Sequence, residues 1–375
     1  MKLKEICENI TDGSHNPPSG IEGSEYLMLS SKNVFNDKIT LEEPRYLSEE
    51  QFLVEDKRTC IKAGDVLMTI VGTVGRAAVV TNDIPKITLQ RSVAVLHPIS
   101  DVCNSRFLMY LLQSKKKFFE QEAHGVAQKG IYLKQLSEIS VSLPAISQQE
   151  DIVDKLDRIN KIIKSRQLEL DKLDELIKAR FVEMFGDPRI NPFKWDVVNI
   201  SEVVGGKVSN GFFAKRDDYC EDGNISVLGV ANIVNRMYSN LDDLPRTNAC
   251  DKDIEKFEVK YGDMLFCRSS LVAEGIGKAS IIPEGVGDNI LFECHVIRLP
   301  LDLDKCVPEF MQTLSTMDYF RNQVISQSKT ATMTTIGQDG ILKTDIILPP
   351  IEKQKEFYDF VKQVDKSKVV ELTAT

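Results

Sequence analysis

The sequence has few of the side chains that build metal or disulfide sites. Its 375 residues include eight cysteines without a C-x-x-C pair, and only four histidines, none in an H-E-x-x-H arrangement. These spacings argue against a metal site and favour buried free thiols. No apolar run approaches the length of a membrane-spanning helix, and the charged opening Met1 to Glu8 differs from a signal peptide. We therefore expect a cytoplasmic protein with no membrane contact and no metal.

The sequence also lacks an excess of positive charge. Its formal net charge is −9 at pH 7, which argues against a protein that binds nucleic acid by bulk electrostatics. Residues 1–145 carry 17 basic and 18 acidic side chains, and residues 188–350 carry 17 and 23. Any basic surface must therefore be local.

Motifs for catalysis are missing as well. The sequence has no Walker A lysine motif and no recognisable Ser/His/Asp or Cys/His arrangement. The segment Gly72-Thr73-Val74-Gly75 is too short for a dinucleotide fingerprint and is typical of a hairpin turn. The string Asn16-Pro17-Pro18-Ser19 is similar to the loop with which amino-methyltransferases hold a flipped base, but Ser19 cannot stack on that base. No strand, Gly-rich turn and helix are placed to bind S-adenosylmethionine, so we expect no catalytic residues.

What the sequence does contain is one long amphipathic helix, predicted for residues 146–185. From Ile152, alternating steps of four and three residues reach apolar side chains at eight of ten positions. Ser147 and Glu150 predict a capping box, and Gly186 followed by Pro188 predicts the end. About 38 residues give a rod of roughly 57 Å, long enough to separate two bodies. The predicted seam comprises Ile152, Leu156, Ile159, Ile163, Leu170, Leu173 and Ile177.

The second half of the sequence repeats the first at a shift near 200 residues. Leu29–Asn36 aligns with Leu228–Asn235, and Gly75-Arg76-Ala77 aligns with Gly277-Lys278-Ala279. The helix has a counterpart too. A Leu-Pro pair precedes the start of each helix, at Leu143-Pro144 and Leu348-Pro349, and a glutamine lies three residues into each helix, at Gln149 and Gln354. The seam of this second helix is predicted at Phe357, Val361 and Val364.

The order of these segments predicts an α+β fold. Two repeated, mostly β domains, residues 1–145 and 188–350, alternate with two helical segments, residues 146–187 and 351–375. Runs of β-branched residues broken by glycines predict the strands. The two helices are expected to pair as an antiparallel coiled coil with pseudo-twofold symmetry.

Polar and basic residues recur at loop positions of both domains. A basic residue follows the glycine of the same hairpin in each copy, and the loop before the last strand is polar in both. Gln can pair with adenine, and Lys or Arg with guanine or phosphate. The predicted DNA-contacting residues are Ser14, His15, Thr73, Arg76, Arg91, Gln128, Lys129, Lys134, Asn210, Lys215, Arg216, Arg268, Ser269, Lys278, Lys329 and Thr334.

Several strings together resemble the specificity subunit of Type I restriction-modification systems. They are Leu176–Pro188 (LIKARFVEMFGDP) closing the long helix, Leu-Pro and Gln at the head of each helix, Asp12–Pro18 (DGSHNPP), and the repeated Gly-Asp-Val/Met-Leu. The resemblance covers nearly the whole chain. It implies two target recognition domains, each reading one half of a bipartite DNA site, with the coiled coil fixing the unread spacer. The domain cores differ in sequence, which predicts an asymmetric target with half-site centres about 10 base pairs apart.

The same resemblance implies partners. These are double-stranded DNA, methyltransferase (modification) subunits and restriction subunits. No cofactor is expected on this chain, since S-adenosylmethionine, ATP and Mg would belong to the partner subunits. Basic partner subunits could share phosphate neutralisation, which would reconcile DNA binding with the acidic composition.

One departure concerns the second helix. By the repeat it should extend to about residue 390, so we expect it to be short by about 15 residues and to dock one modification subunit less well. Two alternative functions stay open from sequence alone. One is a stand-alone DNA methyltransferase or nuclease, and the other is a duplicated coiled-coil adaptor that binds proteins.

Overall fold

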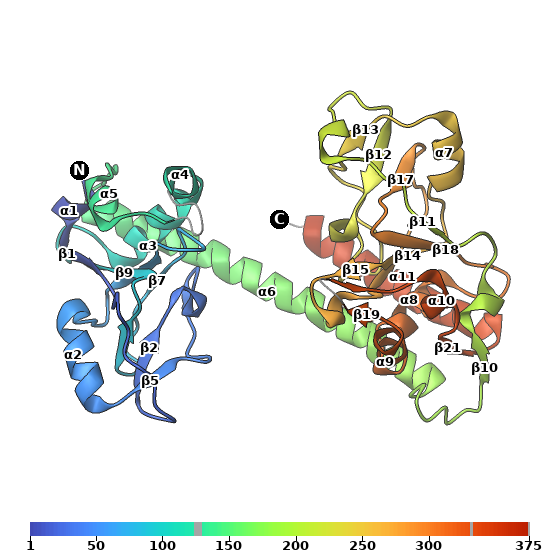
Figure 1. Cartoon of the computed structure of the whole chain (residues 1–375), viewed down its shortest axis with the longest axis horizontal. Helices are drawn as coiled ribbons and strands as arrows, with labels where there is room; N and C mark the ends of the chain where they lie inside the picture. The colour runs from blue at the N-terminus through green and yellow to red at the C-terminus, as the bar shows by residue number, and fades with distance from the viewer. Residues whose placement is uncertain (124–129, 331–332, 374–375) are drawn as a thin grey trace. The chain divides into compact units, whose positions relative to one another are not determined.

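The computed structural model describes residues 1–123, 130–330 and 333–373. The chain forms two compact units, Met1–Lys164 (unit 1) and Ser165–Thr375 (unit 2), and the long helix α6 contributes residues to both (Figure 1). Each unit combines sheets with helices, which confirms the predicted α+β class. In the described part of the chain, no helix is long and apolar enough to cross a membrane.

Unit 1 is built on a four-stranded antiparallel sheet in the order β1-β9-β6-β7. Helix α3 covers one face of this sheet, and the three-stranded sheet β5-β2-β8 packs on the other, with β2 parallel to β8. The strands are β1 (Cys7–Asp12), β2 (Tyr26–Leu29), β3 (Val34–Phe35), β4 (Lys38–Ile39), β5 (Arg45–Leu47), β6 (Val66–Thr69), β7 (Ala77–Val79), β8 (Ile87–Leu89) and β9 (Val93–Pro98). The helices are α1 (Leu3–Ile6), η1 (Ser31–Asn33), α2 (Glu49–Thr59), α3 (Ser105–Ser114), α4 (Lys116–Glu122), α5 (Leu133–Glu138) and the first part of α6 (Ile146–Phe185).

Unit 2 repeats this topology. Its four-stranded sheet has the order β11-β18-β14-β16, and its three-stranded sheet β13-β12-β17 again contains one parallel pair. The strands are β10 (Asp196–Asn199), β11 (Ser209–Asn210), β12 (Ile225–Leu228), β13 (Arg246–Thr247), β14 (Asp263–Cys267), β15 (Ser269–Ser270), β16 (Ala279–Ile281), β17 (Ile290–Phe292), β18 (Val296–Pro300), β19 (Lys329–Thr330), β20 (Thr334–Thr335) and β21 (Asp345–Leu348). The helices are η2 (Ile200–Val203), η3 (Arg216–Asp218), η4 (Val230–Asn232), α7 (Asp251–Phe257), η5 (Ala273–Gly275), α8 (Pro308–Ser315), α9 (Asp318–Ser326), α10 (Gln338–Leu342) and α11 (Ile351–Thr373).

The central strands explain why the sequence runs there are continuously apolar. In β6, Val66 and Met68 join the core beneath α3, whereas Leu67 joins the core beneath the second sheet. In β14, Met264 and Leu265 divide in the same way between two cores. Successive side chains of a strand point to opposite faces, so a strand covered on both faces must be apolar throughout.

A buried glutamine anchors each helix at the repeated Leu-Pro and Gln positions. Gln149 donates to the carbonyls of Val102 and Pro144, both at 2.9 Å, and accepts from the backbone N–H of Asn104. Gln354 makes the same three kinds of bond with Lys305, Pro349 and Val307. Both side chains are fully buried, and a buried amide is stable only when its groups are paired. The repeated motif is therefore structural.

Helix α6 begins at Ile146 and ends at Phe185, as predicted, although its start is formed differently. Gln148 accepts a hydrogen bond from the backbone N–H of Ala145 at 3.2 Å, in place of the predicted capping box. At the other end, Gly186 has φ +78°, and a Cβ there would lie 2.4 Å from a carbon of Pro192. A left-handed residue in such close contact must be glycine.

Within unit 2, α6 and α11 pair in antiparallel orientation. The ring of Phe357 lies 5.5 Å from that of Phe181, and eleven residues later Lys368 forms an ion pair with Asp174 at 2.7 Å. Among the predicted seam residues, Ile177, Phe357, Val361 and Val364 are buried, and Leu170 and Leu173 are half-buried.

The amino-terminal part of the predicted seam is wrong. Leu156 is only half-buried, Ile152 is exposed, and Ile159 and Ile163 are 52% and 59% exposed. The reason is that the described side chains of α11 pair with α6 from Asp174 onward. Heptad periodicity shows which face of a helix is apolar, but burial of that face requires a partner.

Candidate nucleic-acid interface

The loops at one end of the central sheet of unit 1 bring several predicted residues together. Ser14 forms a bridge with Gln90, and Arg91 donates its backbone N–H to the Ser14 carbonyl at 2.9 Å. Ser14, His15 and Arg91 line a hollow of about 300 Å³. His15 is hydrogen-bonded to Asp12 at 2.9 Å, which orients its ring. The exposed His15 and Arg91 therefore lie at one concave surface, and the buried Ser14 forms part of its wall.

A glycine makes this arrangement possible in both units. A Cβ on Gly13 would lie 2.0 Å from the carbonyl oxygen of Leu89, and one on Gly211 would lie 2.2 Å from that of Phe292. Only a residue without a side chain allows the chain leaving β1 or β11 to approach the parallel strand so closely. The repeated dipeptides Asp12-Gly13 and Asn210-Gly211 are explained by this contact.

The hairpin after β6 contributes Thr73 to the same end of unit 1. Thr73 is exposed, its carbonyl accepts from the hydroxyl of Thr69, and Val71 forms a bridge with Gly130. Lys134 lies exposed on α5, a few residues farther along. Gln128 and Lys129 lie outside the described residues, so their predicted role stays a prediction.

Unit 2 brings three of its predicted residues, Ser269, Lys329 and Thr334, together on a small three-stranded sheet, β15-β20-β19. Ser269 pairs with Thr335, which also pairs with Lys329, and Thr334 precedes Thr335 in the central strand. Arg268 precedes this sheet and donates a guanidinium N–H to the carbonyl of Cys294 at 3.1 Å. Asn210, the last residue of β11, pairs with Ile297 on β18.

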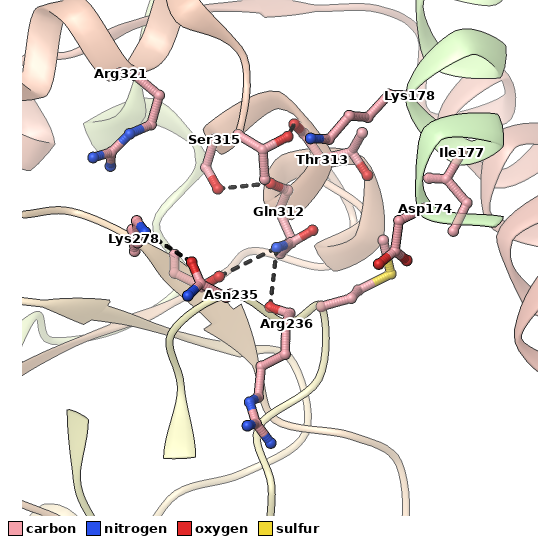
Figure 2. Close-up of a pocket in the computed structure, with 13 residues that line it drawn as sticks. Asp174, Ile177, Lys178, Asn235, Arg236, Lys278, Gln312, Thr313, Ser315 and Arg321 are labelled. Atoms are coloured by element: carbon pink, nitrogen blue, oxygen red, sulfur yellow. Dashed lines mark hydrogen bonds between the residues drawn. The ribbon is translucent and has the colours of Figure 1, made fainter. Parts of the chain in front are cut away.

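Four predicted residues lie elsewhere. The guanidinium of Arg76 packs over the ring of Phe35, 5.0 Å from its centre, and is not among the residues that line the hollow of unit 1. Lys215 and Arg216 are exposed at η3, beside the second sheet of unit 2. Lys278 lines a separate pocket and donates to Asn235 at 2.7 Å (Figure 2).

Exposed apolar side chains at the loop end of unit 2 were missed by the sequence analysis. Phe213 is 69% exposed and Leu271 is 82% exposed. Ser270 pairs with Thr334 in antiparallel orientation. Leu271, which follows β15, and Met333, which precedes β20, therefore lie at the same end of this strand pair. The repeat aligns Phe213 with His15 and Leu271 with the Gly72-Thr73 hairpin. An apolar residue in an exposed turn is a detectable signal, because turns favour polar residues.

The possible metal ligands and the cysteine thiols of the described residues have surroundings typical of structural side chains. No group of three or more His, Cys, Asp or Glu is placed there to hold a metal ion. All eight cysteines are free thiols. Burial raises the pKa of Cys7 to about 12 and that of Cys103 to about 11, which disfavours the reactive thiolate.

The fold and these loops define a class of protein: a duplicated α+β protein whose two units each present polar and basic side chains at the loop end of a central sheet. The chain belongs to the Type I restriction modification DNA specificity domain family, whose sequence model matches residues 1–174 and 192–374.

Individual relatives carry the same description. Over 293 residues the chain is 22% identical to the Type I restriction enzyme MjaVIII specificity subunit of Methanocaldococcus jannaschii, covering 74% of this chain and 67% of that protein. Over 156 residues it is 28% identical to the Type I restriction enzyme EcoBI specificity subunit of Escherichia coli, covering 41% and 31%. It therefore spans about two thirds of the first relative and under a third of the second.

A solved structure supports the fold. The crystal structure of a Type-I restriction-modification system S subunit from M. genitalium matches with a TM-score of 0.50 at 11% identity. The match covers 100% of this chain and 91% of that one.

Proposed function

We propose that this chain is the DNA-reading subunit of a Type I restriction-modification complex and has no catalytic activity of its own. The loop end of unit 1 binds one half of a bipartite target, and the loop end of unit 2 binds the other half. In this proposal the chain also assembles modification and restriction subunits, which hold S-adenosylmethionine, ATP and Mg²⁺.

The observation that carries the proposal is one loop end repeated with different chemistry. Unit 1 presents His15 and Arg91, whereas unit 2 presents Phe213, which the repeat aligns with His15, and Arg268. Arg and hydroxyl side chains can bond base edges, and apolar side chains can contact the thymine methyl group. Two readers with the same framework and unlike surfaces favour an asymmetric target.

Exposed apolar residues on α6 favour the assembly role. Ile159, Ile162 and Ile163 are all more than half exposed and lie within five residues of one another on α6. Contiguous exposed apolar residues mark contact surfaces in soluble proteins. We propose that partner subunits cover this part of α6.

The decisive experiment compares adenine methylation, base by base, across the host genome with and without the gene. Loss of one bipartite, asymmetric motif is the expected result and would supply the target sequence. An unchanged methylation pattern in a strain with active modification subunits would contradict the proposal. Methylation of DNA by the purified chain alone would favour the stand-alone methyltransferase instead, and absence of salt-dependent DNA binding would favour the protein adaptor.

A further inference from the structure

Unit 2 contains a basic pocket whose lining includes none of Phe213, Arg268 and Leu271 (Figure 2). The pocket has a volume of about 330 Å³ and lies among α6, the turn after η4, the start of β16, and helices α8 and α9. Four cationic side chains line it: Lys178, Arg236, Lys278 and Arg321. Asp174, the only carboxylate among the described residues of its wall, already forms an ion pair with Lys368 at 2.7 Å.

The cations of this basic pocket are not neutralised within the described part of the chain. None of the four has a carboxylate within ion-pair distance there. Arg321 donates one N–H to the carbonyl of Glu274 at 2.9 Å, but its other terminal nitrogen, Nη1, is buried without a hydrogen-bond partner. A buried polar group without a partner destabilises the fold, and more so when it is charged. What an anion in the pocket would neutralise is therefore the charge of the four cations, not the buried Nη1 atom.

The internal repeat supplies a comparison within the same chain. The turn that carries Asn36-Asp37 in unit 1 carries Asn235-Arg236 in unit 2. Asp37 pairs with Arg106 at 3.1 Å and with Lys164 at 3.0 Å. Unit 1 thus neutralises its cations with an internal carboxylate, and unit 2 has a cation in that turn instead.

The polar neutral groups of the pocket are already committed to the protein. Gln312 donates to the carbonyls of Arg236 and Ala279, both at 3.2 Å, which holds the turn in place. The hydroxyls of Thr313, Ser315 and Thr316 donate to carbonyls of their own helix or its end. Arg236, Lys278 and Arg321 each donate one hydrogen bond, to Val234, Asn235 and Glu274. The charge of these cations and their remaining N–H groups are therefore what is left to bind a ligand. The volume is roughly ten times the share of one water in the liquid, which suits an anion of several atoms.

We propose that this basic pocket binds a phosphate group and that the DNA backbone supplies it. The choice of DNA as the source rests on the function proposed above, whereas the phosphate chemistry rests on the pocket alone. A chain of net charge −9 that holds DNA needs local clusters of cations. Such a contact fixes the position of the duplex without reading its sequence.

The first arm of the test measures DNA binding by the full chain with its modification partners, using duplexes with and without the mapped motif over a series of salt concentrations. Arg236→Gln and Lys278→Gln are expected to weaken binding to both duplexes by the same factor and to lower the salt slope by about one each. The methylated motif should stay unchanged. Lys207→Gln, at an exposed lysine outside the pocket, is the charge-matched control and should change neither quantity.

The second arm uses the full chain without DNA and pyrophosphate as the probe. Pyrophosphate should raise the melting temperature of the wild type and not that of the double variant. Stabilisation by pyrophosphate together with unaltered DNA binding by the variants would overturn DNA as the source. No effect of the variants in either arm, or a changed methylation motif, would overturn the phosphate site. If the wild-type complex does not distinguish the two duplexes, the proposed function fails, while the pyrophosphate arm still decides the pocket.

Discussion

The two loop ends differ from each other in individual side chains more than in the strands that carry those side chains. Ser14 and Arg91 are joined because β1 pairs with β9 and the chain leaving β1 then bridges Gln90, which places residues 77 positions apart in the sequence next to each other. Sequence patterns could show that both residues lie in loops, but not that the loops meet. By contrast, the position of Arg76 after a glycine predicted a DNA contact, but its guanidinium packs on the ring of Phe35.

Leu271 should recognise an apolar feature of the DNA if unit 2 reads bases. We expect Leu271→Ala to weaken binding to the target roughly fourfold, since a lost apolar contact of one methyl group is worth about 0.8 kcal/mol. The measurement compares a target containing thymine with one in which deoxyuridine removes the methyl group. The wild type should distinguish the two duplexes and the variant should not. Equal discrimination by both proteins would exclude this contact.

Asp263 should make the stability of unit 2 depend on pH. Burial raises its pKa from 3.8 to about 6, so the folded chain holds this proton more tightly than the unfolded chain. The free energy of unfolding therefore falls as pH rises from about 4 to about 6, by up to about 3 kcal/mol.

The variant Asp263→Asn removes that titration. Relative to the wild type, its free energy of unfolding should increase between pH 4 and pH 7, as measured by denaturant unfolding at each pH. Asp288→Asn, at an exposed position, serves as the control and should follow the wild type. Parallel pH profiles for Asp263→Asn and wild type would contradict the prediction.

At the scale of elements, the sequence predicted the helices better than their partners. The bounds of α6 follow from local signals, namely apolar periodicity and a glycine stop, and these signals survive in the structure. The strand pairs β2-β8 and β12-β17 join segments far apart in the chain, and no local pattern reports such pairing. The same limit explains why Ile159 and Ile163 were assigned to a seam that the described side chains of α11 do not cover.

The described part of the helix pair gives a direct test of that distinction. Phe357→Ala should lower the free energy of unfolding by about 3–5 kcal/mol, because its ring is fully buried against Phe181 and Phe185. Ile163→Ala on the exposed part of α6 should change it by less than about 0.5 kcal/mol in the isolated chain. Denaturant unfolding of both variants measures the difference. A large loss for Ile163→Ala would show that the seam is covered there after all.

At the scale of the whole molecule, the proposed function assigns one half-site to each unit of the repeat. We expect Arg91→Ala to relax recognition in one half-site only and Arg268→Ala in the other only, by about 1–3 kcal/mol at the base pair concerned. Genome-wide methylation mapping of each variant measures this, because relaxed positions appear as degenerate bases in the motif. Degeneracy in both halves after either substitution would mean that the units do not read independently.

The chain also carries its own optical label. It has a single tryptophan, Trp195, whose indole N–H donates to the carbonyl of Phe185 at 3.0 Å and so closes the end of α6. Indole fluorescence depends on the surroundings of that ring, so it reports the state of unit 2, whereas unit 1 contains no tryptophan. A substitution in unit 1 that moves the fluorescence transition would therefore reveal mechanical communication along α6, without any added dye.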